Sequence, residues 1–406
     1  MRIKMTGMFL KVVVLLFVGA GLHNCTEAEV VKGIAADGLS EQFSILLSNA
    51  NASYDSKITR GKRNFFPRSM DGNGIAYVES GDWCSGFFPG CLWQMAMMTN
   101  DSMWKAEALK YTRLMEREKN NGSSHDVGFK IMCSFGQAVK MLDDPTEFNA
   151  IIVQAAKTLS KRFNPNVGCI RSWDWNSDKW KYPVIIDNMM NLELLFKATQ
   201  ICGDSTYFNI AVSHANTTLR NHFRSENSSY HVVDYNPSTG NVISKFTHQG
   251  DSNESAWARG QAWGLYGYTM MYRETHNIIY LQQAEKIAAF IFDNGSLPLD
   301  KIVMWDFNYD ESSGEPRDVS AAAVIASALV DLSDFAPSNE ENYRQLARQI
   351  LDTLISSYAT QQGGSFGYLL KHSVGFKHNN SEVDVPIIYA DYYFLEALNR
   401  YNNLIN

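Results

Sequence analysis

Two aspartates stand where an apolar helical pattern begins, and both could take part in acid–base chemistry. Asp126 follows His125 directly, and Asp187 follows the extended apolar run 182–186. Two carboxyl groups that face one pocket can raise the pKa of one of them, which then serves as an acid near neutral pH. An aspartate at a helix start can instead accept hydrogen bonds from free backbone N–H groups. Capping is the simpler interpretation for either aspartate alone, whereas the two together favour a catalytic pair.

Six tryptophans lie in or beside such helix starts. They are Trp83, Trp93, Trp173, Trp175, Trp257 and Trp263. Aromatic rings at the mouth of an acidic cleft can stack on sugar rings, and core packing is the alternative for each of them. Trp173 and Trp257 stand next to polar residues, which favours a ligand contact. Trp93 and Trp263 lie inside helical patterns, where core packing fits equally well.

Polar donors gather between residues 229 and 259. His231 lies in the segment 229–235, which alternates like a strand or an extended loop, and His248 and Gln249 precede the helical pattern that contains Arg259. A single histidine is more often a structural residue. Two histidines together with an amide and a guanidinium form a set of donors suited to a carboxylate and to hydroxyl groups.

Other chemistries lack their sequence signatures. The chain has no glycine-rich nucleotide motif after a strand, no GxSxG, no HExxH and no P-loop. The cysteines form no CxxC pair and no metal-ligand spacing, so buried free thiols are expected at Cys84, Cys91, Cys133, Cys169 and Cys202. We therefore predict neither a metal nor a cofactor. The net charge of −7 argues against a nucleic-acid partner, and an anionic ligand would need local donors.

The elements that position these residues follow a repeating pattern. Six helical stretches that are apolar nearly all round alternate with six amphipathic stretches that keep a charged face. The apolar stretches begin at 81–86, 125–128, 186–188, 257–261, 317–320 and 389–392, and they end near residues 99, 143, 202, 272, 335 and 401. The amphipathic stretches cover residues 39–53, 102–118, 147–163, 206–223, 280–293 and 341–358.

The two helix populations predict two layers. Six helical hairpins, none of which can bury its own apolar face, are satisfied by closing into a ring with the apolar helices inside. This arrangement is an all-α (α/α)6 barrel, and it brings the polar helix starts to one mouth. An open helical solenoid is the alternative. We expect residues 25–406 to form one catalytic domain, because no linker, charge run or low-complexity stretch divides them.

Residues 1–24 have the pattern of an export signal. Arg2, Lys4 and Lys11 accompany the apolar run 12–18, and small residues follow it. The apolar run is too short for a permanent membrane span, so no integral membrane segment is expected after signal removal. The stretch 22–25 resembles a bacterial lipoprotein cleavage site with Cys25 as the first mature residue. We predict a periplasmic protein, and attachment of a lipid to Cys25 is one of two alternatives.

Seven motifs then follow one another along almost the whole mature chain. They are GDWCSGFFPG at 81–90, HDVGF at 125–129, IDNMMNL at 186–192, YHVVDY at 230–235, THQG at 247–250, SAWARGQAWG at 255–264 and YADYYF at 389–394. This ordered set resembles glycoside hydrolase family 88, the unsaturated glucuronyl hydrolases.

The resemblance implies an (α/α)6 barrel and an oligosaccharide substrate. Members of the family remove a terminal 4,5-unsaturated uronic acid from fragments that polysaccharide lyases produce, here those of glycosaminoglycans. An aspartic acid protonates C4 of the vinyl ether, water adds at C5, and the resulting hemiketal opens to release the sugar. Asp187 matches the family's general acid and base, and Asp126 matches its second essential aspartate.

The resemblance also implies a set of sugar-binding residues. Those that match or neighbour the binding positions are Trp83, His125, Trp173, His231, His248, Gln249, Trp257, Arg259 and Trp263. Ser85 stands where some members have Asn, and Cys84 stands where many have Thr. Ser85 is therefore a candidate in a loop that departs from the family pattern.

Three other functions remain open at this stage. The related family 105 removes unsaturated galacturonyl ends from pectin fragments on the same barrel. An ordinary inverting glycosidase would also use two carboxylates. A non-catalytic surface lipoprotein could capture oligosaccharides without cutting them. The stretch 371–377 lies where some relatives bind substrate sulfate but departs from their spacing, so the preference for sulfated sugars also stays open.

Overall fold

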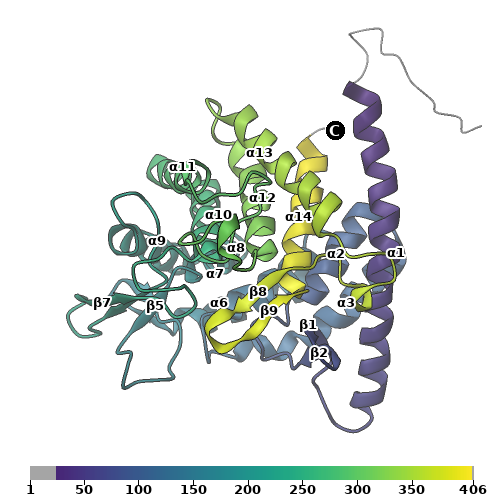
Figure 1. Cartoon of the computed structure of the whole chain (residues 1–406). Helices are drawn as coiled ribbons and strands as arrows, with labels where there is room; N and C mark the ends of the chain where they lie inside the picture. The colour runs from purple at the N-terminus through teal and green to yellow at the C-terminus, as the bar shows by residue number, and fades with distance from the viewer. Residues whose placement is uncertain (1–23, 405–406) are drawn as a thin grey trace, which may run out of the picture.

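The structure is a computed structural model that describes residues 24–404, with side chains from residue 36. Figure 1 shows a mainly helical chain whose short strands gather at one end of the helices. The predicted export signal lies outside the described residues except for the backbone of Asn24, and the side chain of Cys25 also lies outside them.

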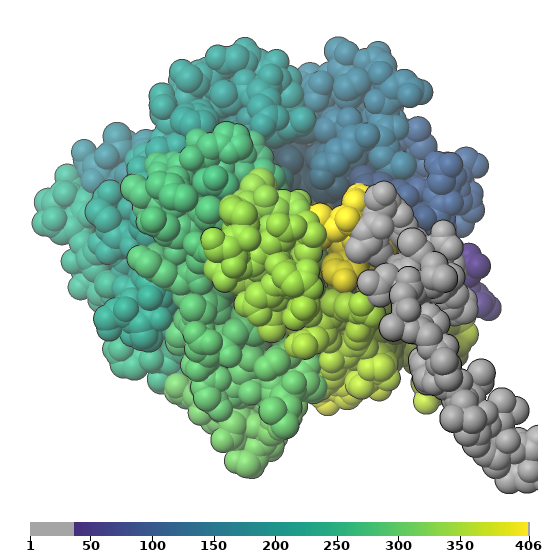
Figure 2. Space-filling model, turned by 90° about the horizontal axis from the view of Figure 1, so that it is seen from above, coloured from purple at the N-terminus to yellow at the C-terminus, as the bar shows by residue number. Residues whose placement is uncertain are grey.

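Six inner units form a closed ring. They are α2 (Phe87–Thr99), α4 with α5 (Val127–Met132 and Phe135–Ala138), α7 with α8 (Asn188–Asn191 and Glu193–Cys202), α10 (Ala258–Thr275), α12 (Val319–Ser333) and α14 (Ile388–Leu404). Each unit contacts the next, and α14 contacts α2. Figure 2 shows the chain passing round the molecule from blue through green to yellow. The predicted (α/α)6 barrel is confirmed, because the ends of an open solenoid would not meet.

Six outer helices surround the ring. They are α1 (Asn24–Ile58), α3 (Ser102–Leu114), α6 (Thr146–Ser160), α9 (Ser205–Asn221), α11 (Ile278–Asp293) and α13 (Glu340–Thr353). Each of them contacts a neighbouring inner unit. Asp101, Asp204 and Asn277 cap α3, α9 and α11 by accepting a backbone N–H two residues further on. A 3-10 helix (Glu116–Asn120) follows α3, and a π-helical turn (Leu354–Tyr358) follows α13.

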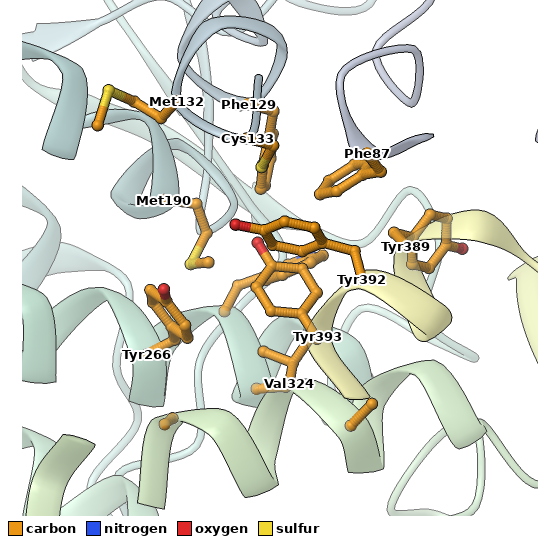
Figure 3. Close-up of a cluster of buried hydrophobic side chains, with 14 of the residues drawn as sticks. Phe87, Phe129, Met132, Cys133, Met190, Tyr266, Val324, Tyr389, Tyr392 and Tyr393 are labelled. Carbon is orange, nitrogen blue, oxygen red and sulfur yellow. The ribbon is translucent and has the colours of Figure 1, made fainter. Parts of the chain in front are cut away.

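The barrel axis is filled by side chains from every inner unit. Figure 3 shows Phe87 from α2, Phe129 from α4, Met190 from α7, Tyr266 from α10, Val324 from α12 and Tyr393 from α14. All of these side chains are buried. An inner helix therefore meets the axis on one face and the outer layer on the other, which explains why its sequence is apolar nearly all round.

Two inner units are less regular than their sequence patterns predict. The second pattern extends to about residue 143, but α5 ends at Ala138. Ser134 interrupts this unit, because its Oγ donates to the carbonyl of Lys130 at 2.6 Å and its backbone leaves the helical region, with φ −101° and ψ −80°. The third unit is divided at Leu192 into α7 and α8. The prediction of one continuous helical stretch is wrong for both units.

Short antiparallel strands lie at the end of the barrel where the inner helices begin. β1 (Phe66–Asp71) pairs with β2 (Gly74–Val78), β3 (Phe163–Asn164) with β4 (Cys169–Ile170), and β8 (Ser373–Phe376) with β9 (Ser381–Val385). A three-stranded sheet joins β5 (Pro183–Ile185), β6 (Val232–Tyr235) and β7 (Val242–Phe246), with Val184 opposite Val233. The extended runs predicted at 182–186 and 229–235 contribute β5 and β6. The other hairpins were not predicted.

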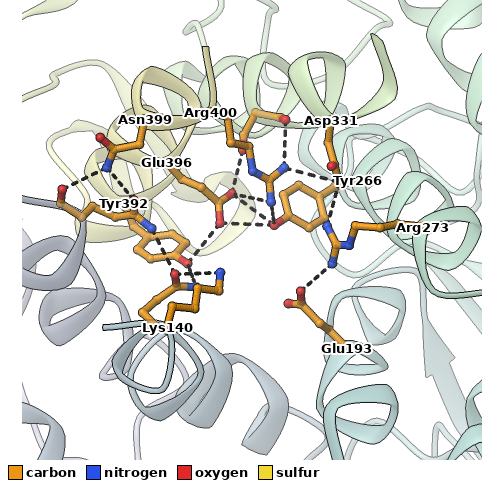
Figure 4. A network of polar contacts seen from close by, with 12 residues as sticks. Lys140, Glu193, Tyr266, Arg273, Asp331, Tyr392, Glu396, Asn399 and Arg400 are labelled. Carbon is orange, nitrogen blue, oxygen red and sulfur yellow. Dashed lines mark hydrogen bonds and ion pairs between the residues drawn. The ribbon is translucent and has the colours of Figure 1, made fainter. Parts of the chain in front are cut away.

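The opposite end of the barrel holds charged side chains that neutralise one another (Figure 4). Near the C-terminal end of α10, Arg273 binds Glu193 at 2.6 Å and Asp331 at 2.8 Å. Arg400 on α14 lies 3.5 Å from Glu396. Removing one partner of such a pair would leave an uncompensated charge, so we expect the complete network to stabilise this end of the barrel.

The cysteines are free thiols wherever the structure describes their side chains. Cys84, Cys91, Cys133 and Cys169 are buried, as predicted. Cys202 is exposed, so the prediction is wrong for this residue, which ends α8 where the chain turns outward through Gly203. Within residues 24–404, no helix is both long and apolar enough to cross a bilayer.

Glycine at position 128 should be essential for the packing of α4 on α7. A Cβ atom at Gly128 would lie 2.6 Å from the backbone Cα of Asn191, which cannot move aside. We expect Gly128→Ala to lower the free energy of unfolding by about 1–3 kcal/mol, measured by urea denaturation. Gly264→Ala on α10 is the control, because the nearest atoms to its Cβ lie 3.5 Å away. Equal stability of the two variants would contradict this packing.

Candidate active site

A pocket of about 310 Å³ opens at the end of the barrel where the inner helices begin. Its walls come from helix starts, from the β5–β6–β7 sheet region and from the β8–β9 hairpin. The residues that line it are Arg68, Trp83, Ser124, His125, Asp126, Ser172, Trp173, Trp175, Ile185, Asp187, His248, Gln249, Arg259, Gly375, Phe376, Asn379, Ser381, Glu382 and Tyr389. Both carboxyl groups of the predicted pair are among them.

The position of Asp187 is set by strand β5 on one side and by glycines of α10 on the other. β5 ends at Ile185, and the Ile186 N–H donates to the carbonyl of His231 at 3.1 Å. A Cβ at Gly260 would lie 3.4 Å from the side chain of Ile186, and one at Gly267 would lie 2.4 Å from Met189 Cβ. The absence of side chains on this face of α10 lets the start of α7 approach closely, which fixes the position of Asp187 at the pocket.

Asp126 is tied to the same framework through α7. Asn191 accepts a hydrogen bond from the Phe129 N–H at 2.7 Å, across the close contact at Gly128. Ser172 adds a second link, because its carbonyl accepts from His125 and its Oγ donates to Asn188 Oδ1 at 2.8 Å. The helix starts that carry the two aspartates are therefore joined by buried hydrogen bonds.

Neither aspartate of the pair caps its helix. Asp126 precedes α4 and Asp187 precedes α7, yet neither side chain makes a capping hydrogen bond. Asp318 at the start of α12 shows the contrast, because it accepts from the backbone N–H groups of Ser320 and Ala321. The capping interpretation that suits a single aspartate is therefore excluded for Asp126 and Asp187, whose carboxyl groups are available to a ligand.

Asp187 is only 9% exposed. Burial raises its pKa to about 7, because the ionised form loses hydration; the positive charge of Arg259 opposes this rise, and the negative charge of Asp126 adds to it. Burial is thus the main cause, and pairing with the second carboxylate is a smaller one. A carboxyl group with this pKa keeps its proton in a large fraction of molecules near neutral pH.

The second aspartate is more open to solvent and has polar neighbours. The Asp126 side chain is 18% exposed, and its Oδ2 accepts from Ser124 Oγ at 2.9 Å. His125 Nε2 lies 3.2 Å from Asp126 Oδ1. Burial lowers the pKa of His125. The two aspartates therefore occupy different environments, which is the arrangement that separates the roles of two carboxyl groups.

Aromatic rings form two walls of the pocket. Trp173 and Trp175 stack with their ring centroids 4.6 Å apart and their planes 10° apart, and Trp175 keeps 46% of its surface exposed. His248 packs 5.2 Å from Trp175. In the other wall, the centroid of Trp83 lies 5.0 Å from that of Tyr389. Flat apolar faces beside polar groups suit a sugar ring, which has both kinds of surface.

The structure brings eight of the predicted site residues to the pocket wall. They are Trp83, His125, Asp126, Trp173, Asp187, His248, Gln249 and Arg259.

The other four predicted site residues lie behind the wall. Ser85 is fully buried and donates to the carbonyls of Ser80 and Asp82, so it shapes the first loop. Trp263 is fully buried against Phe129, and its indole also acts on the Asp187 carboxyl group, where it partly opposes the rise in pKa that burial causes.

The remaining two of these four lie beside residues of the pocket wall. His231 is 3% exposed, and its Nε2 lies 3.7 Å from Asp187 Oδ2. Trp257 packs against the His231 ring at 4.6 Å and under the guanidinium of Arg259, also at 4.6 Å. His231 and Trp257 therefore contact pocket-lining residues without lining the pocket themselves.

Comparison with known proteins agrees with this geometry. Residues 68–403 match glycosyl hydrolase family 88. The chain belongs to this family. An unsaturated glucuronyl hydrolase from Formosa agariphila is 50% identical over 345 residues, which cover 84% of this chain and 86% of that protein.

Two solved structures show the same architecture. One is an unsaturated glucuronyl hydrolase specific for heparin, with 42% identity, a TM-score of 0.83, and coverage of 91% of this chain and 98% of the other. The second is a mutant unsaturated glucuronyl hydrolase from Streptococcus agalactiae complexed with dGlcA-GalNAc6S, with 26% identity, a TM-score of 0.75, and coverage of 96% and 98%.

Part of the wall of this family 88 pocket comes from segments without a sequence signal. Arg68 on β1 holds Glu382 on β9 through two hydrogen bonds of 2.8 and 2.7 Å, and it also binds Asp82 at 2.7 Å. Gln249 Nε2 donates to the carbonyl of Gly375 at 3.0 Å. These contacts fix the β8–β9 hairpin over the pocket. No spacing rule connects residue 68 with residue 382.

Metal ligation finds no support in the part of the chain that the structure describes. Residues 36–404 contain no group of three or more His, Cys, Asp or Glu side chains that could hold a metal ion.

The raised pKa of Asp187 predicts that the stability difference between the wild type and Asp187→Asn depends on pH. The folded pKa of about 7 exceeds the unfolded value of about 3.9, so the stability contributed by Asp187 is fully present below pH 4 and is lost as the pH rises to 7. Asparagine stays neutral throughout. We expect Asp187→Asn to be as stable as the wild type at pH 4 and more stable by about 2–4 kcal/mol at pH 8.

Urea unfolding of both proteins between pH 4 and pH 9 measures this difference. Asp143→Asn is the matched control, because Asp143 is exposed and makes no contact with the pocket. A difference between wild type and Asp187→Asn that stays constant over the whole pH range would show that Asp187 titrates like an ordinary carboxyl group.

Proposed function

We propose that this family 88 chain is an unsaturated glucuronyl hydrolase. It removes the terminal 4,5-unsaturated uronic acid from glycosaminoglycan-derived oligosaccharides made by polysaccharide lyases. The observation that carries this function is the Asp187 carboxyl group, which is buried at the pocket, has no capping role and has a pKa of about 7. The names of the relatives support the substrate class, since they include an unsaturated glucuronyl hydrolase and a complex with dGlcA-GalNAc6S.

The reaction begins with proton transfer to carbon. Asp187 donates its proton to C4 of the vinyl ether, and the positive charge that develops is shared between C5 and the ring oxygen. Water then adds at C5 while the Asp187 carboxylate accepts the proton that the water loses. The enzyme's proton is thereby restored. The product is a hemiketal, which opens and releases the remaining sugar.

Acidity and geometry both favour Asp187 for this step. Protonating a carbon atom requires a group that still holds its proton at working pH, and the efficiency of a general acid is greatest when its pKa is near that pH. Asp187 meets this condition through burial. Asp126, which is more exposed, supplies a negative charge near the developing positive charge, and such electrostatic stabilisation is usually a large contribution to catalysis.

Binding groups surround the position of the sugar. Trp83 and the stacked pair Trp173 and Trp175 offer ring faces. Gln249 offers an amide at the wall. Arg259 is 1% exposed, forms a buried ion pair with Asp318 at 2.9 Å and donates to the carbonyls of Val374 and Gly375, so its main role at the wall is to hold the β8–β9 hairpin.

The alternatives fit these observations less well. A lipoprotein that only captures sugars gains nothing from a buried carboxyl group with a raised pKa, since ionisation of such a group costs stability. The match to family 88 and the names of the relatives favour glucuronyl over galacturonyl substrates.

We also propose that residues 1–24 direct export to the periplasm and that Cys25 is the first mature residue and carries a lipid. The basic start, the short apolar run and the small residues before Cys25 support this proposal. Mass spectrometry of the membrane fraction should find a chain that begins at Cys25 and carries acyl groups, and Cys25→Ala should move the protein to the soluble fraction. A soluble wild-type protein with a free thiol at Cys25 would contradict lipid attachment.

The activity itself is tested with unsaturated disaccharides from chondroitin, heparin and pectin lyases. Loss of the ultraviolet absorbance of the C4=C5 double bond reports turnover. We expect turnover of the glucuronyl disaccharides, none by Asp187→Asn, and retained binding of substrate by this variant in calorimetry. Asp126→Asn should lower activity strongly because it removes the nearby negative charge. Full activity of Asp187→Asn would exclude Asp187 as the acid, and preference for the pectin disaccharide would contradict the substrate assignment.

A further inference from the structure

His231 holds a fixed orientation behind the pocket wall. It stands directly before β6, and its Nδ1 accepts two hydrogen bonds of 3.1 Å, one from the backbone N–H of His248 and one from that of Gln249. A backbone N–H group can only donate, so Nδ1 must present its lone pair. Flipping the ring would place a carbon atom against both N–H groups. The two hydrogen bonds therefore define the orientation of the ring.

The same hydrogen bonds define where the ring proton lies. With Nδ1 occupied as an acceptor, a neutral imidazole carries its proton on Nε2. A cationic ring would need a proton on Nδ1 as well, which would break both hydrogen bonds. Burial and neighbouring positive groups lower the pKa of His231 well below its usual value, in agreement with a neutral ring.

The Nε2–H group faces the catalytic carboxyl group. Nε2 lies 3.7 Å from Asp187 Oδ2, and both atoms are fully buried without a hydrogen-bond partner among the described residues. Trp257 packs against the ring at 4.6 Å, which limits its movement. A donor and an acceptor that face each other across this gap can close to a hydrogen bond with a shift of less than 1 Å.

We propose that His231 is a positioning residue for Asp187. Its Nε2–H group donates to Oδ2, so the transferable proton of Asp187 is on Oδ1. After this proton has moved to C4, the same Nε2–H group stabilises the carboxylate of Asp187. Because its lone pair is committed to the backbone, His231 cannot act as the general base. This role rests on the proposed function of Asp187.

Several other charged or titratable groups face the two side chains. They are His125 and Asp126 ahead of α4, His222 after α9, His248 after β7, and Arg259 on α10. A His231 variant that still accepts from the His248 and Gln249 N–H groups is expected to leave all of them in place. A change in the pH profile of a His231 variant can therefore be assigned to the missing contact with Asp187.

Two substitutions separate a positioning role from a purely structural one. Asparagine places an acceptor near the position of Nδ1, so His231→Asn keeps a partner for the two backbone N–H groups but loses the donor toward Asp187. Glutamine reaches the position of Nε2, so His231→Gln keeps that donor but loses the backbone acceptor. A positioning role predicts that His231→Gln is more active than His231→Asn. A purely structural role predicts that His231→Asn is the more active of the two.

We expect His231→Asn to lower kcat by about ten- to a hundredfold, because one donor to a developing negative charge is lost. Without this donor the carboxylate is less stable, so the basic limb of the kcat/KM profile should move up by about one pH unit. His231→Gln should stay closer to the wild type in both measures. A wild-type profile for His231→Asn together with an impaired His231→Gln would overturn the proposal.

His214 offers a matched control. It is also fully buried, its Nδ1 accepts from the Ile170 N–H at 2.9 Å, and its Nε2 has no hydrogen-bond partner among the described residues. It is not among the groups that act on Asp187. His214→Asn should therefore leave the basic limb where it is, and a shift equal to that of His231→Asn would also overturn the proposal.

Nitrogen-15 NMR of the free protein tests the proton position without any substrate. We expect the shifts of His231 to show a protonated Nε2 and an unprotonated Nδ1 from pH 5 to pH 9, and the Nε2 signal to move in Asp187→Asn. A protonated Nδ1 would overturn the proposal. This result does not depend on turnover, so a wild-type enzyme inactive on all unsaturated disaccharides would refute the proposed function separately.

Discussion

An ionised carboxylate in apolar surroundings costs free energy, and the mouth of this barrel is arranged around a carboxyl group in such a position. Among the ion pairs of the described residues, none joins Asp187 to a lysine or an arginine; its nearest basic partner is the neutral ring of His231. The contacts of Ile186 with Gly260 and of Met189 with Gly267, both on α10, hold it there. The proposed proton transfer from Asp187 at neutral pH depends on this placement, since an exposed aspartate would be almost fully ionised.

The two ends of the barrel differ in how their charged side chains are paired. At the end opposite the mouth, Arg273 and Arg400 neutralise the acidic side chains around them. At the mouth, Asp126 and Asp187 sit at helix starts without capping them. The free energy of folding that is lost at the mouth must be supplied by the packed axis and by the ion pairs at the opposite end.

The sequence predicts the ring well because helical periodicity and the need to bury apolar faces are properties of whole segments. It predicts the neighbourhood of the site for the same reason, since the helix starts must meet at one mouth. It does not distinguish Asp318, which caps α12, from Asp187, which does not cap α7, because capping depends on side-chain orientation. The same limit explains Ser85, whose hydroxyl turns toward the backbone of its own loop.

Contacts between distant segments could not be predicted. The β8–β9 hairpin reaches the pocket only because Arg68 binds Glu382 and because Arg259 and Gln249 hold the carbonyl of Gly375. Periodicity carries no information about such pairs. The break at Ser134 also depends on a local hydrogen bond of its hydroxyl with the backbone, which competes with the helix that the apolar pattern favours.

The most direct test of the account is a titration of the Asp187 carboxyl carbon by carbon-13 NMR, with the Asp187→Asn variant used to assign the signal. The account predicts a midpoint near pH 7 in the free protein, as burial of the carboxyl group requires. A midpoint near pH 4 would show that Asp187 is ionised at working pH, and it would contradict proton donation from this residue to carbon.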